Sequence, residues 1–231
     1  ITYQKNDELI FSDGNSKAVD DDIEINAKNF EYNKLSNIIF AKGDVKVNNK
    51  KENYLIFSDK ITYQKNDELI FSDGNSKASD GGVTIYGDKF NFDQTQNILN
   101  AQGNVKVDDK IEKIIIETNF LTYQKNLNKI FTKGKTKALI QSKYEFISND
   151  VFLDKELKEF KSDKFSTIKD DNFNLNKLSK FLYFFDRKFL KGNNIEVQNN
   201  FGKEKNDKFY FDNAFINFSD NSFISKDTKI E

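Results

Sequence analysis

The sequence of 231 residues contains no histidine, cysteine, proline, methionine or tryptophan. Without histidine or cysteine there can be no Ser-His-Asp triad, no cysteine nucleophile, no disulfide and no conventional zinc or haem site. The longest apolar runs, at residues 114–116 and 181–185, are far shorter than the roughly 20 residues that a membrane-spanning helix needs. Because the chain opens inside a repeat and carries no initiator methionine, we interpret it as a piece of a longer protein.

No charge of one sign dominates. The 36 Lys and Arg residues nearly balance the 37 Asp and Glu residues, which leaves a net charge of −1. A nucleic-acid-binding domain usually carries a basic surplus or a basic stripe. The composition therefore predicts no nucleic-acid partner.

An internal repeat organises the chain. The string ITYQKNDELIFSDGNSKA at residues 1–18 is repeated unchanged at 61–78, and within this long period a Tyr or Phe precedes a glycine by eleven positions. Degraded copies follow at residues 152–163 and 181–192. We predict one continuous domain over residues 1–231, with regular repeats at 1–138 and diverged repeats at 139–231, because no Gly/Ser-rich linker interrupts it.

Each half-repeat has the pattern of β-strands. In residues 39–47 every second side chain is apolar or small, and charged side chains lie between them, which is typical of a strand with one buried face. Between Ala27 and Phe30 the apolar side chains change from odd-numbered to even-numbered positions, and we call this a parity switch. The switch recurs at the equivalent positions of later copies, which predicts a β-bulge there. The lack of proline agrees with a chain of ladder-forming strands.

The expected fold class is all-β. Short polar turns between strands permit only antiparallel neighbours, and the spacing predicts on the order of 14–16 strands. One hairpin cannot bury its apolar row alone, so the hairpins must stack into a repeat-built, twisted structure. The charged run at residues 154–158 could pass for a short helix, but a helix is disfavoured there.

Three motifs suggest chemistry, and each has a better structural explanation. Gly134-Lys135-Thr136 resembles the end of a phosphate-binding loop but lacks the earlier glycine and falls in mid-strand. Residues 20–22 with Glu24 offer oxygen ligands for calcium but lack the spaced ligand pattern. Asp59 and Asp88 repeat along the chain at the parity switch, so we assign them to bulges. The sequence predicts no catalytic residue, no metal and no cofactor.

The side chains on the predicted buried face of the strands, which we call the inward row, bear most directly on function. Its side chains are small or branched, whereas Phe11, Phe40, Phe71 and Phe131 have the opposite parity. Such a row can pack tightly against a facing sheet, or it can leave a long apolar furrow that suits acyl chains. Periodicity alone does not decide between the two.

A family resemblance favours the furrow. Ile25-x-Ala27, Phe30-x-Tyr32 and residues 38–47, with their counterparts at 56–63, resemble the lipopolysaccharide-transport bridge domain, also called the OstA-like domain. The resemblance covers residues 1–138. The tail, at residues 205–214 and 223–230, resembles the segment that precedes the barrel in the LptD family of outer-membrane assembly proteins.

This resemblance implies a periplasmic β-jelly-roll with an open hydrophobic groove, through which the acyl chains of lipid A pass toward the outer membrane. It implies that a bridge protein of the LptA family pairs with an edge strand of the chain. In a full-length protein of the LptD type, the domain is attached to the outer membrane through a barrel, which this sequence lacks, and a lipoprotein plug, LptE, joins that barrel.

We therefore expect a non-enzymatic lipid conduit with lysines at its rim that meet lipid phosphates. The expected lining consists of Ile39, Ala41, Val45, Val47, Leu99, Ala101, Val105, Val107, Ile130 and Ala138. Alternatives are a filled structural repeat, such as an adhesin or a spacer, and a soluble bridge protein of the LptA type. A carboxylate-based glycan hydrolase is the third, and it needs two inward acids about 5–10 Å apart.

Overall fold

The computed structural model describes residues 1–5, 8–170, 174–199, 207–220, 222–225 and 228–230. In these residues the regular structure is β-strand, apart from a 3-10 turn, η1, at Lys125–Leu127. Residue contacts group the chain into two compact units, unit 1 at Ile1–Lys110 and unit 2 at Ile111–Glu231. Within the described ranges, no helix is long and apolar enough to span a bilayer.

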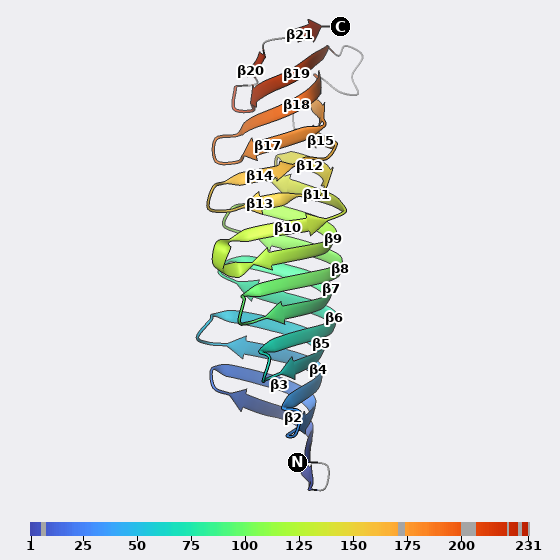
Figure 1. Ribbon diagram of the computed structural model, residues 1–231, viewed down its shortest axis with the longest axis vertical. Helices are drawn as coiled ribbons and strands as arrows, with labels where there is room; N and C mark the ends of the chain where they lie inside the picture. Colours follow the sequence, from blue (N-terminus) through green and yellow to red (C-terminus); the bar gives the residue numbers. More distant parts are fainter. Residues whose placement is uncertain (6–7, 171–173, 200–206, 221, 226–227, 231) are drawn as a thin grey trace. The chain divides into compact units, whose positions relative to one another are not determined.

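Unit 1 is a series of long antiparallel strands that follow one another along the chain (Figure 1). The turns between them are short, so each strand pairs with the next. The strands are β1 (Thr2–Gln4), β2 (Leu9–Asp20), β3 (Ile23–Asn33), β4 (Ile38–Asn49), β5 (Tyr54–Gln64), β6 (Leu69–Asp80), β7 (Val83–Asp93) and β8 (Ile98–Asp109).

The strands from β2 to β8 bend in the middle, where their pairing shifts register. One shift falls between Asn26 and Asn29, at the predicted parity switch, so the expected bulges are confirmed. In β4 the bend contains Gly43 and Asp44 at φ 81° and 48°. Glycine has no Cβ, and aspartate tolerates the left-handed region better than most residues.

The bends divide unit 1 into two halves, which we call wall A and wall B. Residues of each wall are aligned with one another by the strand pairing. Wall A comprises residues 2–4, 9–13, 29–33, 38–42, 60–64, 69–73, 89–93 and 98–102. Wall B comprises residues 16–20, 23–27, 45–49, 54–58, 76–80, 83–87 and 105–109.

Unit 2 follows the same plan with shorter strands, because most of them are interrupted at the bend. This is why the described strands outnumber the expectation. They are β9 (Ile114–Gln124), β10 (Lys129–Lys133), β11 (Lys135–Ile140), β12 (Tyr144–Asn149), β13 (Phe152–Asp154), β14 (Glu159–Ser162), β15 (Ser166–Lys169), β16 (Leu175–Leu178), β17 (Lys180–Phe184), β18 (Phe189–Gln198), β19 (Lys208–Asn217), β20 (Ser222–Ser225) and β21 (Thr228–Ile230).

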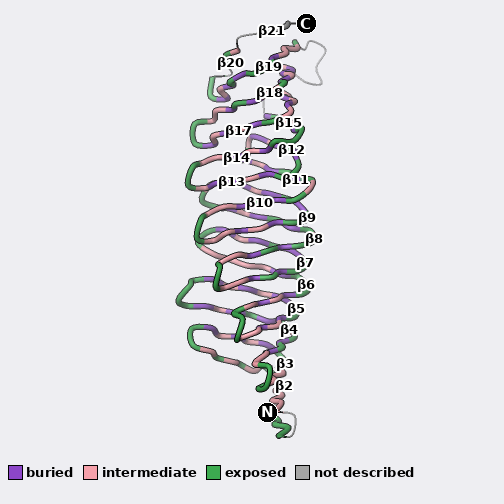
Figure 2. The backbone as a smooth tube through the Cα atoms, in the orientation of Figure 1, coloured by how far each residue is buried: buried purple, intermediate pink, exposed green. Residues whose placement is uncertain are grey.

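Unit 2 has two walls of the same kind, which we also call wall A and wall B. Strands β10, β13, β14 and β17 pair side by side and form its wall A, together with the adjoining halves of β9, β18 and β19. Strands β11, β12, β15 and β16 form its wall B, with the other halves of β9, β18 and β19. Buried and more exposed residues alternate along the strands (Figure 2).

The predicted fold class is confirmed: the chain is all-β and consists of stacked antiparallel hairpins with the geometry of a β-jelly-roll. The run at residues 154–158 ends β13 and then forms a turn rather than a helix. The apolar run at residues 181–185 lies in β17 up to Phe184. Of the segments that carry the tail's resemblance, residues 205, 206, 226 and 227 lie outside the described residues.

Candidate functional site

The ten predicted lining residues all face inward. None of them is more than 6 % exposed, so their predicted parity is confirmed, whereas contact with a lipid stays a prediction. The structure does not bring all ten into one unit. Eight lie in unit 1, on β4 and β8: Ile39, Ala41, Val45, Val47, Leu99, Ala101, Val105 and Val107. Ile130 and Ala138 lie in unit 2, on β10 and β11.

Most of the inward face of wall B in unit 1 is aliphatic; the exception is Tyr54 at the edge away from the bends, whose ring meets Phe92 of wall A with centroids 5.0 Å apart. One row of register partners crosses the strands β2 to β8 without an aromatic ring. It consists of Ala18, Ile25, Val47, Ile56, Ala78, Ile85 and Val107. Such side chains can shift without leaving a rigid ring in the way of a guest.

Wall A of unit 1 contains inward rings, but small side chains separate them. Phe30 pairs in register with Ser12 on one side and with Ala41 on the other. Phe90 likewise lies between Ser72 and Ala101. Each of these rings therefore has small side chains beside it in the row rather than a second ring.

Hydroxyl groups line the inside of the bends. Ser72 and Ser76, on either side of the bend of β6, share a hydrogen bond of 2.7 Å between their Oγ atoms. The backbone N–H of Phe90 donates to Ser72 Oγ over 3.0 Å, and Ser58 Oγ donates to the carbonyl oxygen of Gly74 over 2.9 Å. These bonds satisfy backbone groups that the bulge leaves out of the strand ladder.

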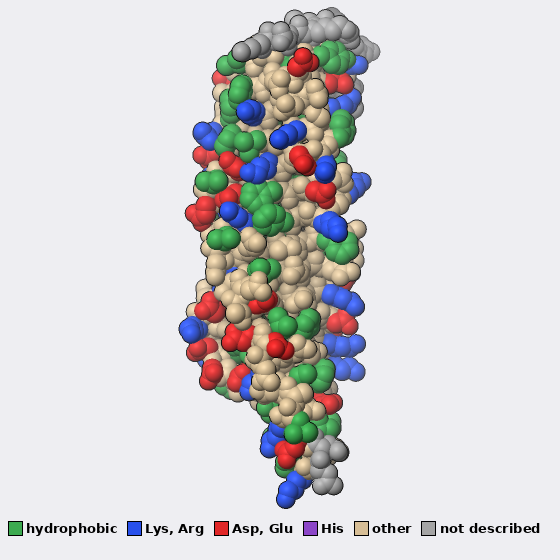
Figure 3. All heavy atoms as spheres, viewed as in Figure 1, with side chains coloured by type: hydrophobic (Ala, Val, Ile, Leu, Met, Phe, Trp, Pro, Cys, Tyr) green, Lys and Arg blue, Asp and Glu red, His purple; other side chains and the backbone are tan. Residues whose placement is uncertain are grey.

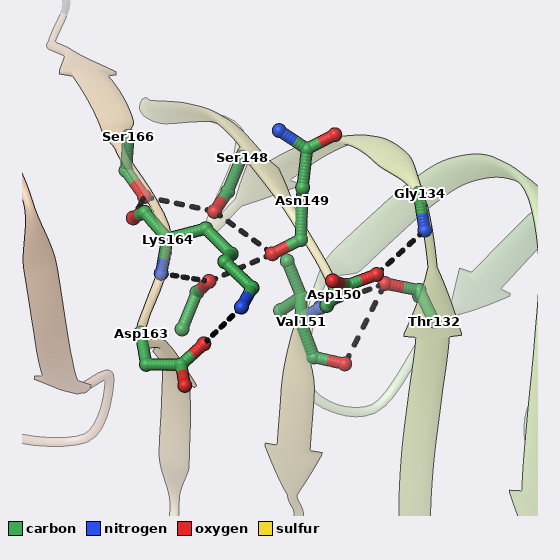
Figure 4. A network of polar contacts seen from close by, with 10 residues as sticks. Thr132, Gly134, Ser148, Asn149, Asp150, Val151, Asp163, Lys164 and Ser166 are labelled. Atoms are coloured by element: carbon green, nitrogen blue, oxygen red, sulfur yellow. Dashed lines mark hydrogen bonds and ion pairs between the residues drawn. The ribbon is translucent and has the colours of Figure 1, made fainter.

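Unit 2 has a similar network at its bends (Figure 4). Thr132 Oγ1 accepts the N–H of Val151 over 2.9 Å, and Thr132 and Thr136 share a hydrogen bond of 2.7 Å. Further along, Ser148 and Ser166 share one of 2.8 Å. Thr136 is therefore a buried part of the bend between β10 and β11, where Gly134 and Lys135 also lie.

The outside of the bends carries carboxylates that bind neighbouring amides. Asp59 accepts from Asn75 Nδ2 over 2.8 Å, and Asp88 accepts from Asn104 Nδ2 over 3.0 Å. Both carboxylates serve the bulges, as their repetition predicts.

Wall A of unit 1 also has a concavity of about 550 Å³ next to the bend. Its charged lining mixes acids with lysines (Asp13, Glu31, Lys42 and Lys60), so it favours neither an anionic nor a cationic ligand.

The edge of unit 1 opposite the bends, which we call the seam, is joined by polar contacts between the walls. Asp20 on wall B accepts a hydrogen bond from the Tyr63 hydroxyl over 3.3 Å and forms an ion pair of 2.9 Å with Lys65. The Tyr54 hydroxyl donates to Gln94 Oε1 over 2.6 Å. The side chains of Asp20 and Lys65 are each about a quarter exposed, so water can replace their contact.

The seam changes the titration of its tyrosine and lysine. Burial, together with the negative charge of Asp20, raises the pKa of Tyr63 to about 12. The hydrogen-bonded contact with Asp20 raises the pKa of Lys65. Both groups therefore keep their protons at neutral pH, and the seam is closed by a neutral phenol and a paired ammonium group.

The acidic residues of this region do not form a metal site. A polar concavity of about 200 Å³ at the seam is lined by residues 20–22, Lys51 and Glu52, among others. Asp20 is bound to Lys65, and Glu24 is bound to Lys17 over 2.8 Å. Across the described ranges, no group of three or more His, Cys, Asp or Glu side chains is placed to hold a metal ion.

Buried carboxylates of unit 2 hold turns rather than forming an acid–base pair. Asp154 accepts the N–H groups of Glu156 and Leu157 over 3.1 and 3.0 Å. Asp170 accepts the N–H of Asn174 over 2.9 Å. Engagement of these oxygens by backbone donors is typical of an Asx-turn.

Six aromatic rings fill the interior of unit 2, and we call them the aromatic cluster. Neighbouring rings have centroids 5.0 to 5.9 Å apart. Five of the six are at most 1 % exposed. The cluster consists of Tyr144, Phe146, Phe160, Phe181, Tyr183 and Phe218. The Tyr183 hydroxyl is buried without a hydrogen-bond partner, and burial raises its pKa.

Sequence reasoning did not find the aromatic cluster or the seam. The aromatic run at residues 181–185 predicts a strand, and nothing in it shows which rings face another wall. The available signal for the seam was the Asp or Asn that ends every second strand of unit 1, at Asp20, Asn49, Asp80 and Asp109. Outward positions are largely charged, and lysines and acids are intermixed on the face shown in Figure 3.

A comparison with protein families agrees with the resemblance in the sequence. Residues 3–112 match the family model described as lipopolysaccharide-assembly, LptC-related. A crystal structure of LptH from Pseudomonas aeruginosa, described as the LptA-homologous periplasmic component of the lipopolysaccharide transport device, aligns at 18 % identity and a TM-score of 0.44. That alignment covers 48 % of this chain and 81 % of LptH. No curated protein matches the chain.

Proposed function

We propose that this chain, whose residues 3–112 match an LptC-related lipopolysaccharide-assembly domain, is a non-enzymatic periplasmic component that holds lipopolysaccharide acyl chains between walls A and B. The family match supports the lipopolysaccharide assignment. The aliphatic inward row of unit 1 is the observation that carries the binding site, because it is apolar, continuous from strand to strand and free of charged groups.

The energetics of the interior suit a reversible carrier. Each acyl CH₂ group that leaves water contributes about 0.8 kcal/mol. Opening the seam breaks partly exposed polar contacts, such as the ion pair of Asp20 with Lys65, which typically contribute about 0–1 kcal/mol. It also separates the rings of Tyr54 and Phe92, a pairing that contributes about 0.5–1.5 kcal/mol beyond its buried area. Burial of a few acyl CH₂ groups can therefore compensate for the free energy lost when these seam contacts break. Directed movement of the lipid requires an energy source outside this chain.

Lysines at the seam are suited to the charged part of the lipid. Lys65 takes part in the contact between the walls, and Lys51 lines the polar concavity beside it. Once the seam opens, both ammonium groups are available for lipid phosphates, with which lysine makes charge-assisted hydrogen bonds. The acyl chains then lie inside and the sugar phosphates outside.

The partners follow from the family and from the strand edges. The match to an LptC-related model favours a component of the LptC or LptA type over an LptD-type protein with a barrel and an LptE plug. We propose that a second transport protein pairs with a terminal strand, by addition of a strand to the sheet. Attachment to the outer membrane is then indirect, through that partner.

A second candidate function is a filled structural repeat. The aromatic cluster favours it for unit 2, because contacting rings occupy the space in which a lipid would lie. It is less suited to unit 1, where rings such as Phe30 have small neighbours.

Photocrosslinking tests the proposal. A small aliphatic diazirine amino acid placed at Val105, which faces inward, is expected to label lipopolysaccharide on illumination. The matched control is its neighbour Lys106, which is exposed on the outward face of the same strand. Labelling at residue 105 with little at 106 supports an interior lipid site. Equal labelling at both positions, or none at residue 105, contradicts it.

A further inference from the structure

We infer that the aromatic cluster closes the interior of unit 2 to acyl chains, so that lipid occupies unit 1 alone. This inference rests on the proposed function and narrows it to one part of the chain. It departs from the expectation that the groove continues through all the stacked units, since Ile130 and Ala138 in unit 2 were expected to line it as well.

The cluster closes unit 2 because its rings bridge the two walls. Phe146 on β12 of wall B contacts Phe160, Phe181 and Tyr183 on wall A, with centroids 5.2, 5.4 and 5.1 Å apart. Carbon atoms of two side chains touch at about 3.5–4.0 Å, so an alkyl chain between two groups needs roughly twice that separation. The observed ring spacing leaves no room for one.

The closure continues to the edge of unit 2 opposite its bends. Tyr144 on wall B stacks on Phe218, with centroids 5.0 Å apart and an angle of 25° between the rings. The same tyrosine contacts Tyr183 on wall A at 5.9 Å. Opening this edge would separate the rings of the cluster, whereas opening the seam of unit 1 separates the ring pair of Tyr54 and Phe92 and polar groups that water readily solvates, such as Asp20 and Lys65.

The difference between the two interiors arises in the inward row of wall B, which can be compared position by position in the two units. In unit 2, the wall B row that continues the aliphatic pattern contains Ala138, Phe146 and Ile168 as register partners. In unit 1, the corresponding row has Ile85 and Val107 as neighbours. One phenylalanine in this row reaches three rings of the opposite wall, and no residue of the unit 1 row carries a ring.

Two buried isoleucines of wall B provide a matched test. Ile85 in unit 1 is 2 % exposed and Ile168 in unit 2 is 0 % exposed, and both face inward. An aliphatic diazirine amino acid replaces each of them in the full chain, and lipopolysaccharide is added before illumination. We expect at least a tenfold higher yield of lipid adduct at residue 85 than at residue 168.

The outcomes separate the two claims. Comparable adduct yields at both positions overturn the confinement to unit 1 and leave the lipid carrier intact. No adduct at either position overturns the proposed function and, with it, the confinement. Adduct at residue 168 alone overturns the confinement as well, because it places the lipid in the unit that the rings close.

A second measurement uses the native side chains and avoids any effect of substitution on folding. Isoleucine methyl resonances of the unmodified chain are recorded with a doxyl-labelled fatty acid. Broadening is expected for inward methyl groups of unit 1, such as those of Ile56 and Ile85, and not for Ile168 of unit 2. Equal broadening in both units contradicts the confinement.

Removal of the closure is the converse experiment. In Phe146→Ala combined with the diazirine at residue 168, the space vacated by the ring should raise the yield of lipid adduct at least threefold. The control is Phe131→Ala, which removes a ring that is 38 % exposed and points outward. An unchanged yield in a variant that retains its circular dichroism spectrum would show that the ring is not what excludes lipid.

Discussion

Units 1 and 2 share their strands, bends and hydroxyl contacts, yet their interiors differ. In unit 1, inward rings such as Phe90 have serine and alanine as register partners. In unit 2, Phe146 contacts three other rings across the walls. The backbone plan is therefore not what distinguishes the two interiors. A few side chains that face the opposite wall make the difference.

The largest expected effect comes from the aromatic cluster. Phe146→Ala should lower the free energy of unfolding by about 3–5 kcal/mol, because it leaves a cavity among rings that cannot collapse. Phe131→Ala, at an exposed position, should cost no more than about 1 kcal/mol. Urea unfolding of both variants checks this. Similar losses would mean that the cluster is not the core of unit 2.

The bends should respond differently in the two units. A Cβ at Gly103, where φ is 76°, would collide with the Asp88 carboxylate, whereas one at Gly134, where φ is 79°, meets nothing within 4 Å. Backbone strain alone costs about 1–3 kcal/mol. Gly103→Ala should therefore destabilise the chain more than Gly134→Ala in thermal unfolding. Removal of the carboxylate in Gly103→Ala/Asp88→Ala should recover part of the difference, and a lack of recovery would contradict the steric explanation.

Loss of a tyrosine hydroxyl should have opposite signs in the two units. Tyr183→Phe should raise the free energy of unfolding by about 1 kcal/mol, since its buried hydroxyl has no partner. Tyr63→Phe should lower it by about 0.5–1 kcal/mol, because its hydroxyl donates to Asp20. Parallel urea titrations of the two variants provide the measurement. The same sign in both would contradict the assigned contacts.

The smallest effect is a pH dependence of the seam in unit 1. The pKa values of Tyr63 and Lys65 are raised in the folded state, Tyr63 to about 12. A group whose pKa is raised by folding stabilises the fold fully below its unfolded pKa, about 10 for tyrosine, and loses this contribution as the pH rises toward the folded value.

The free energy of unfolding of the wild-type chain should therefore fall between about pH 9 and pH 11. In Tyr63→Phe/Lys65→Gln it should fall less, and the two declines should differ by about 1 kcal/mol or below after screening. Urea unfolding at both pH values gives the comparison. An equal decline in the two proteins would show that the seam does not contribute.

Much of the architecture follows from local patterns in the sequence. The period of two and the parity switch between Ala27 and Phe30 predict the strands and the bulge, because both depend on neighbours along one strand. The burial of Val47 and Val107 follows from the same alternation.

Contacts across the interior do not follow from such patterns. The pairing of Asp20 with Tyr63 joins residues 43 positions apart, and the sequence alone suggests only a solvated acidic loop there. Likewise, the run at 181–185 predicts a strand but not that Phe181 and Tyr183 meet Phe146 from the opposite wall. These contacts depend on how two bent walls face each other, which no single segment encodes.

Amide hydrogen exchange with and without lipopolysaccharide tests the central claim most directly. Acyl chains between the walls of unit 1 should slow exchange in β4 to β8, as ligand binding adds to the free energy of opening. Exchange in β12 and β17, which carry the aromatic cluster, should stay unchanged. Uniform protection of both units, or protection of unit 2 alone, would contradict the account.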